Sequence, residues 1–317
     1  MRFVHAQESD GRYAVTLAEA TPPAPKPSEL LVRVAASGVN RADLSQIAGR
    51  YPPPPGEPDI LGLEVSGTVE ATGEAVCALL AGGGHAEYVA VPKGQILPVP
   101  PGMDLVAAAG LPEAFLTAFT NLVLECGLRP RDTVLVHAGA SGVGLAAIRL
   151  AKLYSARVAA TTRTADKLAA LEAAGADLAI DSSADDVAAA IERRFGPDAV
   201  DIVLDPVGAA TLGADLRVLA RGGRVVVIAH LSGGKVEVDL ALLMHKRARL
   251  VGSTLRSRGR PEKAAIVARF REDVLPAFAA GKLGVTVDSV FRPEQAAEAF
   301  QRMRENRNTG KIVIDWR

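Results

Sequence analysis

Cysteine and histidine are scarce in this chain. Only two cysteines occur among the 317 residues, Cys77 and Cys126, and their separation does not match the close ligand spacing of zinc-binding motifs. We interpret them as buried free thiols in a reducing compartment, and we expect the cytoplasm. The five histidines are scattered along the chain, with no pair at ligand spacing. The sequence therefore predicts a protein without a metal site.

Long hydrophobic runs and an excess of one charge are also missing. No apolar run approaches the roughly 18 residues of a membrane span, and no basic segment precedes an apolar stretch at the N-terminus. Lysine and arginine number 36, as do aspartate and glutamate, so nothing indicates a nucleic-acid or anionic-membrane partner. We expect a protein that binds neither nucleic acid nor membrane.

The most informative segment that is present is a glycine-rich loop. A buried-strand run ends at His137, and residues 139–144 then read Gly-Ala-Ser-Gly-Val-Gly before an apolar helical pattern. Backbone N–H groups in such a turn can approach a ligand closely, and the helix N-terminus adds partial positive charge. The loop predicts binding of a dinucleotide pyrophosphate, although a glycine-rich turn without a ligand is the alternative. The expected contacts are Gly139, Ser141, Gly142, Val143 and Gly144.

The segment from about residue 133 to 254 alternates between apolar runs and Ala/Leu-rich amphipathic stretches. This alternation, with short glycine-bearing links, indicates a parallel, doubly wound sheet covered on both faces. The expected strands lie at 133–137, 157–161, 178–180, 200–204, 224–228 and 250–252, and the later helices at 165–174, 184–194 and 209–219.

The rest of the chain differs in composition and in its hydrophobic pattern. Before residue 115, proline and glycine are frequent and the strand-like pieces are short (30–37, 63–71 and 85–91), which favours an antiparallel, partly barrel-like β domain. After residue 260 we expect a long amphipathic helix, then a helix at 293–304 and a strand at 311–315. We expect these C-terminal elements to return to the first domain. The apolar face of the long helix comprises Ile266, Val267, Phe270, Val274, Leu275 and Phe278.

Further motifs span nearly the whole chain, at 37–43, 49–54, 61–67, 82–89, 116–118, in the glycine loop and at 308–313. In this order they resemble the medium-chain dehydrogenase/reductase superfamily, and specifically its zinc-free NADPH:quinone oxidoreductase (zeta-crystallin-like) branch. The resemblance implies an α/β protein in which a GroES-like β-rich catalytic domain, residues 1–116 and 256–317, carries an inserted Rossmann domain, residues 117–255.

The resemblance also bears on the metal. Zinc-dependent members of the superfamily bind catalytic zinc through a cysteine, a histidine and a further cysteine, and at those positions this chain has Asn40, Leu63 and Glu113. Without a Lewis acid an unactivated ketone is a poor hydride acceptor, whereas a quinone or a conjugated enone delocalises the added charge. We therefore expect a conjugated acceptor.

The residues after the second wound strand bear on the choice of cofactor. An NAD-specific site places an acidic residue roughly 20 residues beyond the glycine loop, but this chain has Thr161-Thr162-Arg163-Thr164 there, followed by Lys167. Two cations and two hydroxyls suit a 2′-phosphate, so we predict NADPH. Solvated helix-start cations are the alternative interpretation of Arg163 and Lys167.

By resemblance, Asn40, Asp43 and Tyr51 face the nicotinamide and form the expected catalytic set. Asn40 would hold the nicotinamide ribose or a substrate oxygen, and Asp43 is either catalytic or a helix-capping acid. Tyr51 either orients the acceptor and relays a proton or packs against the proline loop at 52–55. Further residues expected to border the cofactor are Thr117, His230, Leu231 and Arg256, the last being alternatively an interface or surface charge.

Together these features predict an NADPH-dependent quinone oxidoreductase that transfers hydride without a metal. An enone or enoyl double-bond reductase on the same fold shares every motif, and a largely non-enzymatic NADPH-binding protein is an alternative of a different class.

Residues 248–255 form an expected edge strand with unpaired backbone groups. We predict a homodimer through this edge of the Rossmann sheet.

Overall fold

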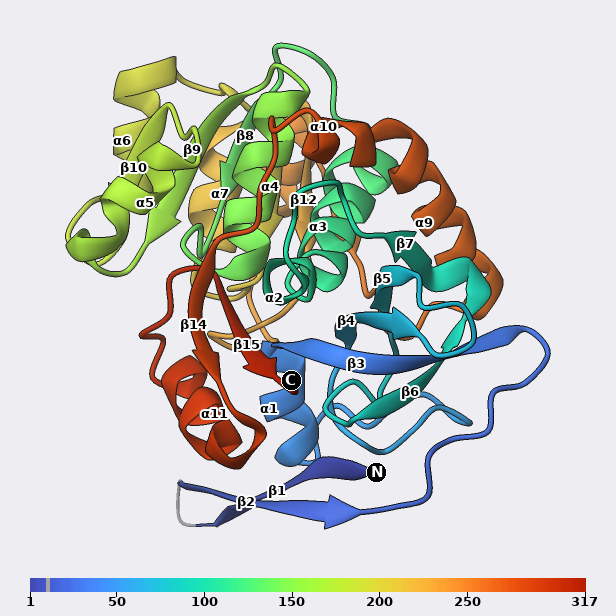
Figure 1. Ribbon diagram of the computed structural model, residues 1–317. Helices are drawn as coiled ribbons and strands as arrows, with labels where there is room; N and C mark the ends of the chain where they lie inside the picture. Colours follow the sequence, from blue (N-terminus) through green and yellow to red (C-terminus); the bar gives the residue numbers. More distant parts are fainter. Residues whose placement is uncertain (10–11) are drawn as a thin grey trace. The chain divides into compact units, whose positions relative to one another are not determined.

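The computed structural model describes residues 1–9 and 12–317 and divides into two compact units (Figure 1). The first unit comprises Met1–Leu116 and Leu255–Arg317, and the second comprises Thr117–Thr254. Leu255, which the sequence assigns to the Rossmann domain, groups with the first unit. The blue and red ends of the chain in Figure 1 thus belong to one unit.

The second unit is built on a six-stranded parallel sheet in the order β10-β9-β8-β11-β12-β13. This order confirms the predicted doubly wound sheet. From β8 the chain adds β9 and β10 on one side, and it then adds β11, β12 and β13 on the other. The carboxyl ends of β8 and β11 therefore border a topological switch point, where ligands of such sheets bind. The strands are β8 (Thr133–Val136), β9 (Arg157–Thr162), β10 (Leu178–Asp181), β11 (Val200–Asp205), β12 (Leu219–Val227) and β13 (Arg249–Gly252).

Side-chain caps decide where the helices of this unit begin. The helix expected from residue 184 starts only after Asp186, whose carboxylate accepts a hydrogen bond from the backbone N–H of Ala189 at 3.0 Å. The helix expected from residue 209 starts at Leu212, because Asp205 binds the N–H groups of Val207 and Gly208 and holds them in a turn. The helices are a π-helix (Thr120–Glu125), α4 (Gly142–Leu153), α5 (Leu168–Ala173) after a 3₁₀ turn (Ala165–Lys167), α6 (Val187–Phe195), α7 (Leu212–Val218) and α8 (Leu240–Lys246).

The first unit contains a seven-stranded sheet in the order β14-β15-β3-β4-β5-β7, with β6 also paired to β3, and a separate β1–β2 hairpin. The C-terminal strand β15 pairs with β3 in antiparallel register, Ile312 opposite Val39, and so completes this sheet (Figure 1). The strands are β1 (Arg2–Ser9), β2 (Arg12–Glu19), β3 (Glu29–Val39), β4 (Glu64–Val69), β5 (Ala75–Leu79), β6 (Tyr88–Pro92), β7 (Ile96–Pro98), β14 (Val287–Phe291) and β15 (Lys311–Asp315).

Two expectations about the first unit need correction. The strand expected at 85–91 begins only at Tyr88, because the preceding residues pack against Gly62; a Cβ there would lie 2.5 Å from the backbone nitrogen of His85. The long helix expected after residue 260 is two helices, since Pro276 cannot continue the backbone hydrogen bonds past Val274. Its six predicted apolar residues are buried, as expected.

The helices of the first unit are short apart from α9. They are α1 (Arg41–Ile47), α2 (Leu105–Ala108), α3 (Pro112–Phe119, which continues into the second unit), α9 (Arg260–Asp273), α10 (Leu275–Ala279) and α11 (Ala296–Arg304), with 3₁₀ turns at Lys93–Gln95 and Pro293–Gln295. Within the described part of the chain, none of the helices is long and apolar enough to cross a membrane.

Candidate functional site

The glycine loop of the second unit connects the carboxyl end of β8 to the first turn of α4. Ser141 caps α4, since its hydroxyl accepts a hydrogen bond from the N–H of Gly144 at 3.0 Å. A Cβ on Gly144 would lie 2.5 Å from the carbonyl oxygen of Ala138 and 2.6 Å from the Cα of Gly139. Only glycine therefore permits this close approach of helix and loop, as in dinucleotide-binding turns.

The predicted phosphate-binding cations follow the adjacent strand. The N–H of Gly139 donates to the carbonyl of Thr161 at 2.7 Å, so the glycine loop is fastened to the carboxyl end of β9. Arg163 is exposed directly after this strand, and Lys167 is partly buried in the 3₁₀ turn that follows. The structure thus brings Gly139, Arg163 and Lys167 to neighbouring strand ends, where the sequence expects the adenosine side of the cofactor.

His230 and Leu231 lie at the same edge of the sheet, after β12. Both are exposed, Leu231 by 55%. The N–H of Leu231 donates to the carbonyl of Pro206 at 3.2 Å, which joins this segment to the one that follows β11. Thr117 lies on α3, where its carbonyl accepts a hydrogen bond from the side chain of Asn121 at 2.8 Å.

A buried ionic pair lies behind the glycine loop. The Nε2 of His137 is 2.7 Å from a carboxylate oxygen of Asp215 on α7, and its Nδ1 is 3.0 Å from the hydroxyl of Thr161. Burial alone would lower the pKa of His137, but the charge and hydrogen bond of Asp215 raise it. Burial also raises the pKa of Asp215. The pair, missed at the sequence level, connects β8, β9 and α7, and Thr161 is thereby engaged inside the fold.

In the first unit, Asp43 is a capping and bracing acid at the start of α1. Its side chain is fully buried, and its carboxylate accepts hydrogen bonds from the N–H of Asn40 at 2.7 Å and from the N–H of Gly62 at 3.0 Å. Both oxygens are therefore bound to backbone donors. Of the two roles that the sequence leaves open, this geometry favours the helix cap.

Asn40 belongs to a polar cluster with the buried residues Glu64 and Lys311 and the partly buried Glu113, which we call the Glu64 cluster. The Asn40 amide donates to Glu64 at 2.9 Å and to the carbonyl of Gly38 at 3.1 Å, and its oxygen accepts from the ammonium of Lys311 at 2.7 Å. Lys311 also forms an ion pair with Glu64 at 2.5 Å. The second oxygen of Glu64 accepts from the backbone N–H of Glu113 at 2.9 Å.

Sequence reasoning did not select Glu64 or Lys311 as site residues. The available signal was an isolated lysine beside the apolar run Ile312-Val313-Ile314 and an isolated glutamate inside a buried run. Glu64 is packed so closely against Gly38 that a Cβ on Gly38 would overlap the Oε1 of Glu64. These groups come from β3, β4 and β15, which adjoin only after folding.

Glu113 is the unusual member of the Glu64 cluster. Burial raises the pKa of its carboxyl group to about 8, and the negative charge of Glu64 acts in the same direction. Its Oε2 is buried and has no hydrogen-bond partner among the residues that the structure describes.

Tyr51 is half-buried beneath Arg256. The guanidinium of Arg256 lies 5.2 Å from the centroid of the Tyr51 ring and donates to the Tyr51 carbonyl at 3.0 Å. It also donates to Gln46 at 2.6 Å and to the carbonyl of Ala81 at 2.7 Å. Arg256, expected at the cofactor, thus braces the Tyr51 segment. Burial raises the pKa of Tyr51, and the charge of Glu113 raises it further.

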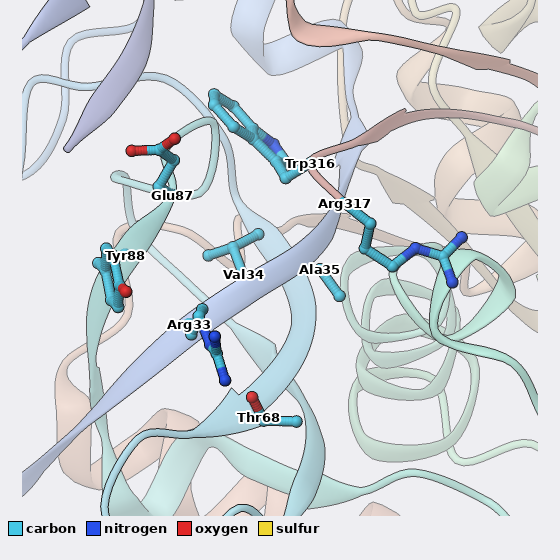
Figure 2. Close-up of a pocket in the computed structure, with 8 residues that line it drawn as sticks. All are labelled: Arg33, Val34, Ala35, Thr68, Glu87, Tyr88, Trp316 and Arg317. Atoms are coloured by element: carbon cyan, nitrogen blue, oxygen red, sulfur yellow. The ribbon is translucent and has the colours of Figure 1, made fainter.

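A hollow of about 420 Å³ elsewhere in the first unit contains none of the predicted site residues. Its lining includes Arg33, Tyr88 and Arg317, and Figure 2 shows the guanidinium of Arg317 pointing away from the other two side chains. Arg317 is paired with Asp315 at 2.9 Å. The two arginines of its lining therefore do not converge on one point.

A glycine loop at the switch point of a doubly wound sheet is typical of dinucleotide-binding proteins. Comparison with known proteins agrees with this class. Residues 26–101 match the alcohol dehydrogenase GroES-like domain and residues 142–272 match the zinc-binding dehydrogenase family. The chain is 27% identical to the quinone oxidoreductase of Lama guanicoe, covering 99% of this chain and 97% of that protein. It is 32% identical to the human synaptic vesicle membrane protein VAT-1 homolog, with 93% and 81% covered.

Among solved structures, the quinone oxidoreductase from Thermus thermophilus, also determined in complex with NADPH, superimposes with a TM-score of 0.84. It is 32% identical, and all of both chains is covered. The chain belongs to the medium-chain dehydrogenase/reductase superfamily, in its quinone oxidoreductase branch.

Proposed function

We propose that this protein is an NADPH-dependent oxidoreductase that reduces a quinone or a similar conjugated acceptor. The observation that carries the proposal is the glycine loop fastened to a strand end that presents Arg163, on a chain that aligns over its full length with quinone oxidoreductases. The structural relative from Thermus thermophilus binds NADPH, which supports the same cofactor here.

The residues of the second unit fit this cofactor. The first turn of α4 offers backbone N–H groups to the pyrophosphate, and Arg163 with Lys167 would hold the 2′-phosphate. His230, Leu231 and Thr117 would border the rest of the molecule. When bound, NADPH supplies the hydride.

The residues of the first unit do not fit a catalytic zinc. At the positions where zinc-dependent relatives place ligands, this chain has the amide of Asn40, the apolar Leu63 and Glu113, whose pKa is raised by burial. The ammonium of Lys311 already contacts both Asn40 and Glu64. We infer that zinc is not required. A conjugated acceptor suits such a site, because its own π system carries the added charge.

In this mechanism Tyr51 orients the acceptor and donates a proton, whereas Asn40 and Asp43 are positioning residues. Asn40 holds Glu64 and Lys311 in place, and Asp43 fixes the start of α1 against Gly62. Arg256 restrains the Tyr51 segment through three side-chain hydrogen bonds. Preorganised placement of this kind supplies much of the rate in enzymes that lack a strong acid–base pair.

The test is NADPH oxidation by the purified, chelator-treated protein with a panel of quinones, enals and acyl-CoA enoates. We expect turnover of quinones, with no loss of rate after chelation. Reduction confined to the carbon–carbon double bonds would assign the protein to the enone reductases. NADPH binding with no turnover of any acceptor would identify a non-enzymatic binding protein, and a zinc-restored activity would contradict the metal assignment.

We also propose a homodimer through β13. This strand lies at the edge of the parallel sheet, paired with β12, and Leu250 on it is 41% exposed. Pairing with a second copy would satisfy its unpaired backbone groups. Light scattering at micromolar concentration should give the mass of a dimer, and a monomer would refute the proposal.

The two cysteines, both free and buried, support a reducing location such as the cytoplasm.

A further inference from the structure

Thr161 joins the glycine loop to the buried interior of the second unit. Its carbonyl oxygen accepts the 2.7 Å hydrogen bond from the N–H of Gly139, the first glycine of the loop. Its side chain is buried, and the hydroxyl oxygen lies 3.0 Å from the Nδ1 of His137. This one residue of β9 therefore binds the loop through its backbone and the interior through its hydroxyl group.

His137 and Asp215 extend this connection to α7. The Nε2 of His137 lies 2.7 Å from a carboxylate oxygen of Asp215, and both side chains are buried. Asp215 stands on α7 between Leu212 and Leu216, whose side chains pack with strand residues in the apolar core of the unit. The acid is thus carried by a helix that apolar packing holds against the sheet.

The amino-terminal end of α7 is also attached to β11. The hydroxyl of Thr211, directly before the helix, donates to the carboxylate of Asp205 at 2.9 Å, and Asp205 is the last residue of β11. The backbone N–H of His137 donates to the carbonyl of Leu204 at 3.1 Å. Helix α7 is therefore bonded to the chain at the ends of β8 and β11, the two strands that border the switch point.

Asp215, His137, Thr161 and Gly139 form a chain of hydrogen bonds, which we call the His137 network. It runs from the firmly held helix α7 to the glycine loop. The bond between His137 and Thr161 can persist whether or not the imidazole is charged, because a hydroxyl group both donates and accepts. The second oxygen of Asp215 is buried and has no hydrogen-bond partner within the described part of the chain, so the orientation of this acid depends on the imidazole.

We propose that His137 is a positioning residue for the nicotinamide cofactor, because through Thr161 it fixes the glycine loop against which the pyrophosphate binds. Backbone N–H groups bind phosphate oxygens only where they point at them, so a displaced loop weakens every such contact. The pyrophosphate is common to NADPH and NADH. The His137 network should therefore affect both cofactors equally, whereas Arg163 should affect only NADPH. This inference rests on the NADPH binding of the proposed function and is independent of the acceptor.

The first test measures the dissociation constants of NADPH and NADH for Thr161→Val. Valine retains the shape of the side chain and the backbone bond to Gly139, but it removes the hydroxyl partner of His137. Both dissociation constants should rise by the same factor, about three- to tenfold, since one hydrogen bond is worth about that much. Thr161→Ser retains the hydroxyl group and should bind both cofactors nearly as the wild-type protein does.

Thr133→Val is the matched control. Thr133 is a buried threonine at the amino end of β8, the strand whose carboxyl end leads into the glycine loop, and its hydroxyl accepts a hydrogen bond from Arg157 at 2.7 Å. The control should lose stability without a change in either dissociation constant. Unchanged constants for Thr161→Val would show that the network only stabilises the fold, and a loss confined to NADPH would place the Thr161 hydroxyl at the 2′-phosphate. Either result would overturn the proposal.

The second test examines the glycine loop in the protein without cofactor, by nuclear magnetic resonance of isotope-labelled glycine amides. Thr161→Val should shift the amide signals of Gly139, Gly142 and Gly144, whereas Thr161→Ser and Thr133→Val should leave them in place. Loop signals that do not move in Thr161→Val would overturn the proposal.

A second variant covers the case in which Thr161→Val does not fold. Asp215→Leu removes the partner of His137 from the other side and places an apolar side chain of similar size among the buried leucines of α7. The same loop signals should shift, and both dissociation constants should rise together. If the wild-type protein binds neither cofactor, the proposed function fails, while the measurement without cofactor still decides whether the His137 network holds the loop.

Discussion

Each unit of this protein buries an ionic cluster, and the two clusters differ in how their charges balance. In the Rossmann unit, His137 is matched with one acid, Asp215, at 2.7 Å. In the β-rich unit, the ammonium of Lys311 contacts Glu64, and a second acid, Glu113, lies in the same cluster. Burial and the charge of Glu64 raise the pKa of Glu113. The first cluster thus pairs one cation with one acid, whereas the second cluster holds two acids around Lys311.

The units also differ in how they would meet a ligand. The Rossmann unit presents backbone N–H groups of a glycine loop and an exposed cation, Arg163. The β-rich unit instead holds its polar groups inside, where low dielectric strengthens each interaction and makes any unpaired group costly. Substitution of Lys311 in the β-rich unit should therefore affect mainly stability, whereas substitution of Arg163 in the Rossmann unit should affect mainly cofactor choice.

The largest effect is expected from Lys311→Met. Removal of the Lys311 ammonium leaves the buried Glu64 carboxylate without a counter-charge, and breaking such a buried ion pair costs about 3–5 kcal/mol. The midpoint of thermal unfolding should fall strongly. The double variant Lys311→Met with Glu64→Gln should recover much of this loss, because neither buried charge remains. A double variant as unstable as the single one would show that packing of the lysine stem, rather than charge, accounts for the effect.

The next largest effect is expected from Arg163→Ala, in binding rather than stability. A charge-assisted contact with the 2′-phosphate is worth roughly 1.5–3 kcal/mol, so the dissociation constant for NADPH should rise about tenfold or more. NADH, which lacks the phosphate, should bind nearly as before. Arg221→Ala, at an exposed arginine of the same unit, is the control. Equal losses for both cofactors would remove Arg163 from phosphate recognition.

These expectations reflect what the sequence could and could not reveal. The Rossmann unit could be predicted because its strands, helices and glycine loop are local patterns, and their alternation indicated a doubly wound parallel sheet. Strands β5 and β7 were missed because they are short. The β1–β2 hairpin was also missed, although its strands are eight residues long and pair with each other. The Glu64 cluster was missed because β15 brings Lys311 beside β3 only on folding.

A smaller loss of stability is expected from Asp215→Ala. It leaves His137 buried without its acid, but histidine can lose its proton where lysine retains it, so the cost should be about 1–3 kcal/mol. The folded pKa of His137 is raised, so the contribution of this group is present below pH 6.5 and is lost as the pH rises through that raised pKa. Because burial also raises the pKa of Asp215, the carboxylate gains a proton in stronger acid and the ion pair is lost there as well. Thermal unfolding midpoints should therefore differ more between the two proteins in weak acid than in alkali. A difference independent of pH would mean that the pair contributes only as a neutral hydrogen bond.

The smallest effect, and the sharpest test of the comparison, is expected from Tyr51→Phe. One neutral hydrogen bond is worth roughly 0.5–1.5 kcal/mol, so kcat should fall by no more than about tenfold, with NADPH affinity within a factor of about two. The ring beneath Arg256 is retained, and the hydrogen bond from Arg256 goes to the backbone carbonyl of residue 51, so the segment should keep its shape. The loss should be larger for an enone, whose carbon must gain a proton, than for a quinone. If kcat is unchanged with both acceptors, Tyr51 only packs against its neighbours and takes no part in the reaction.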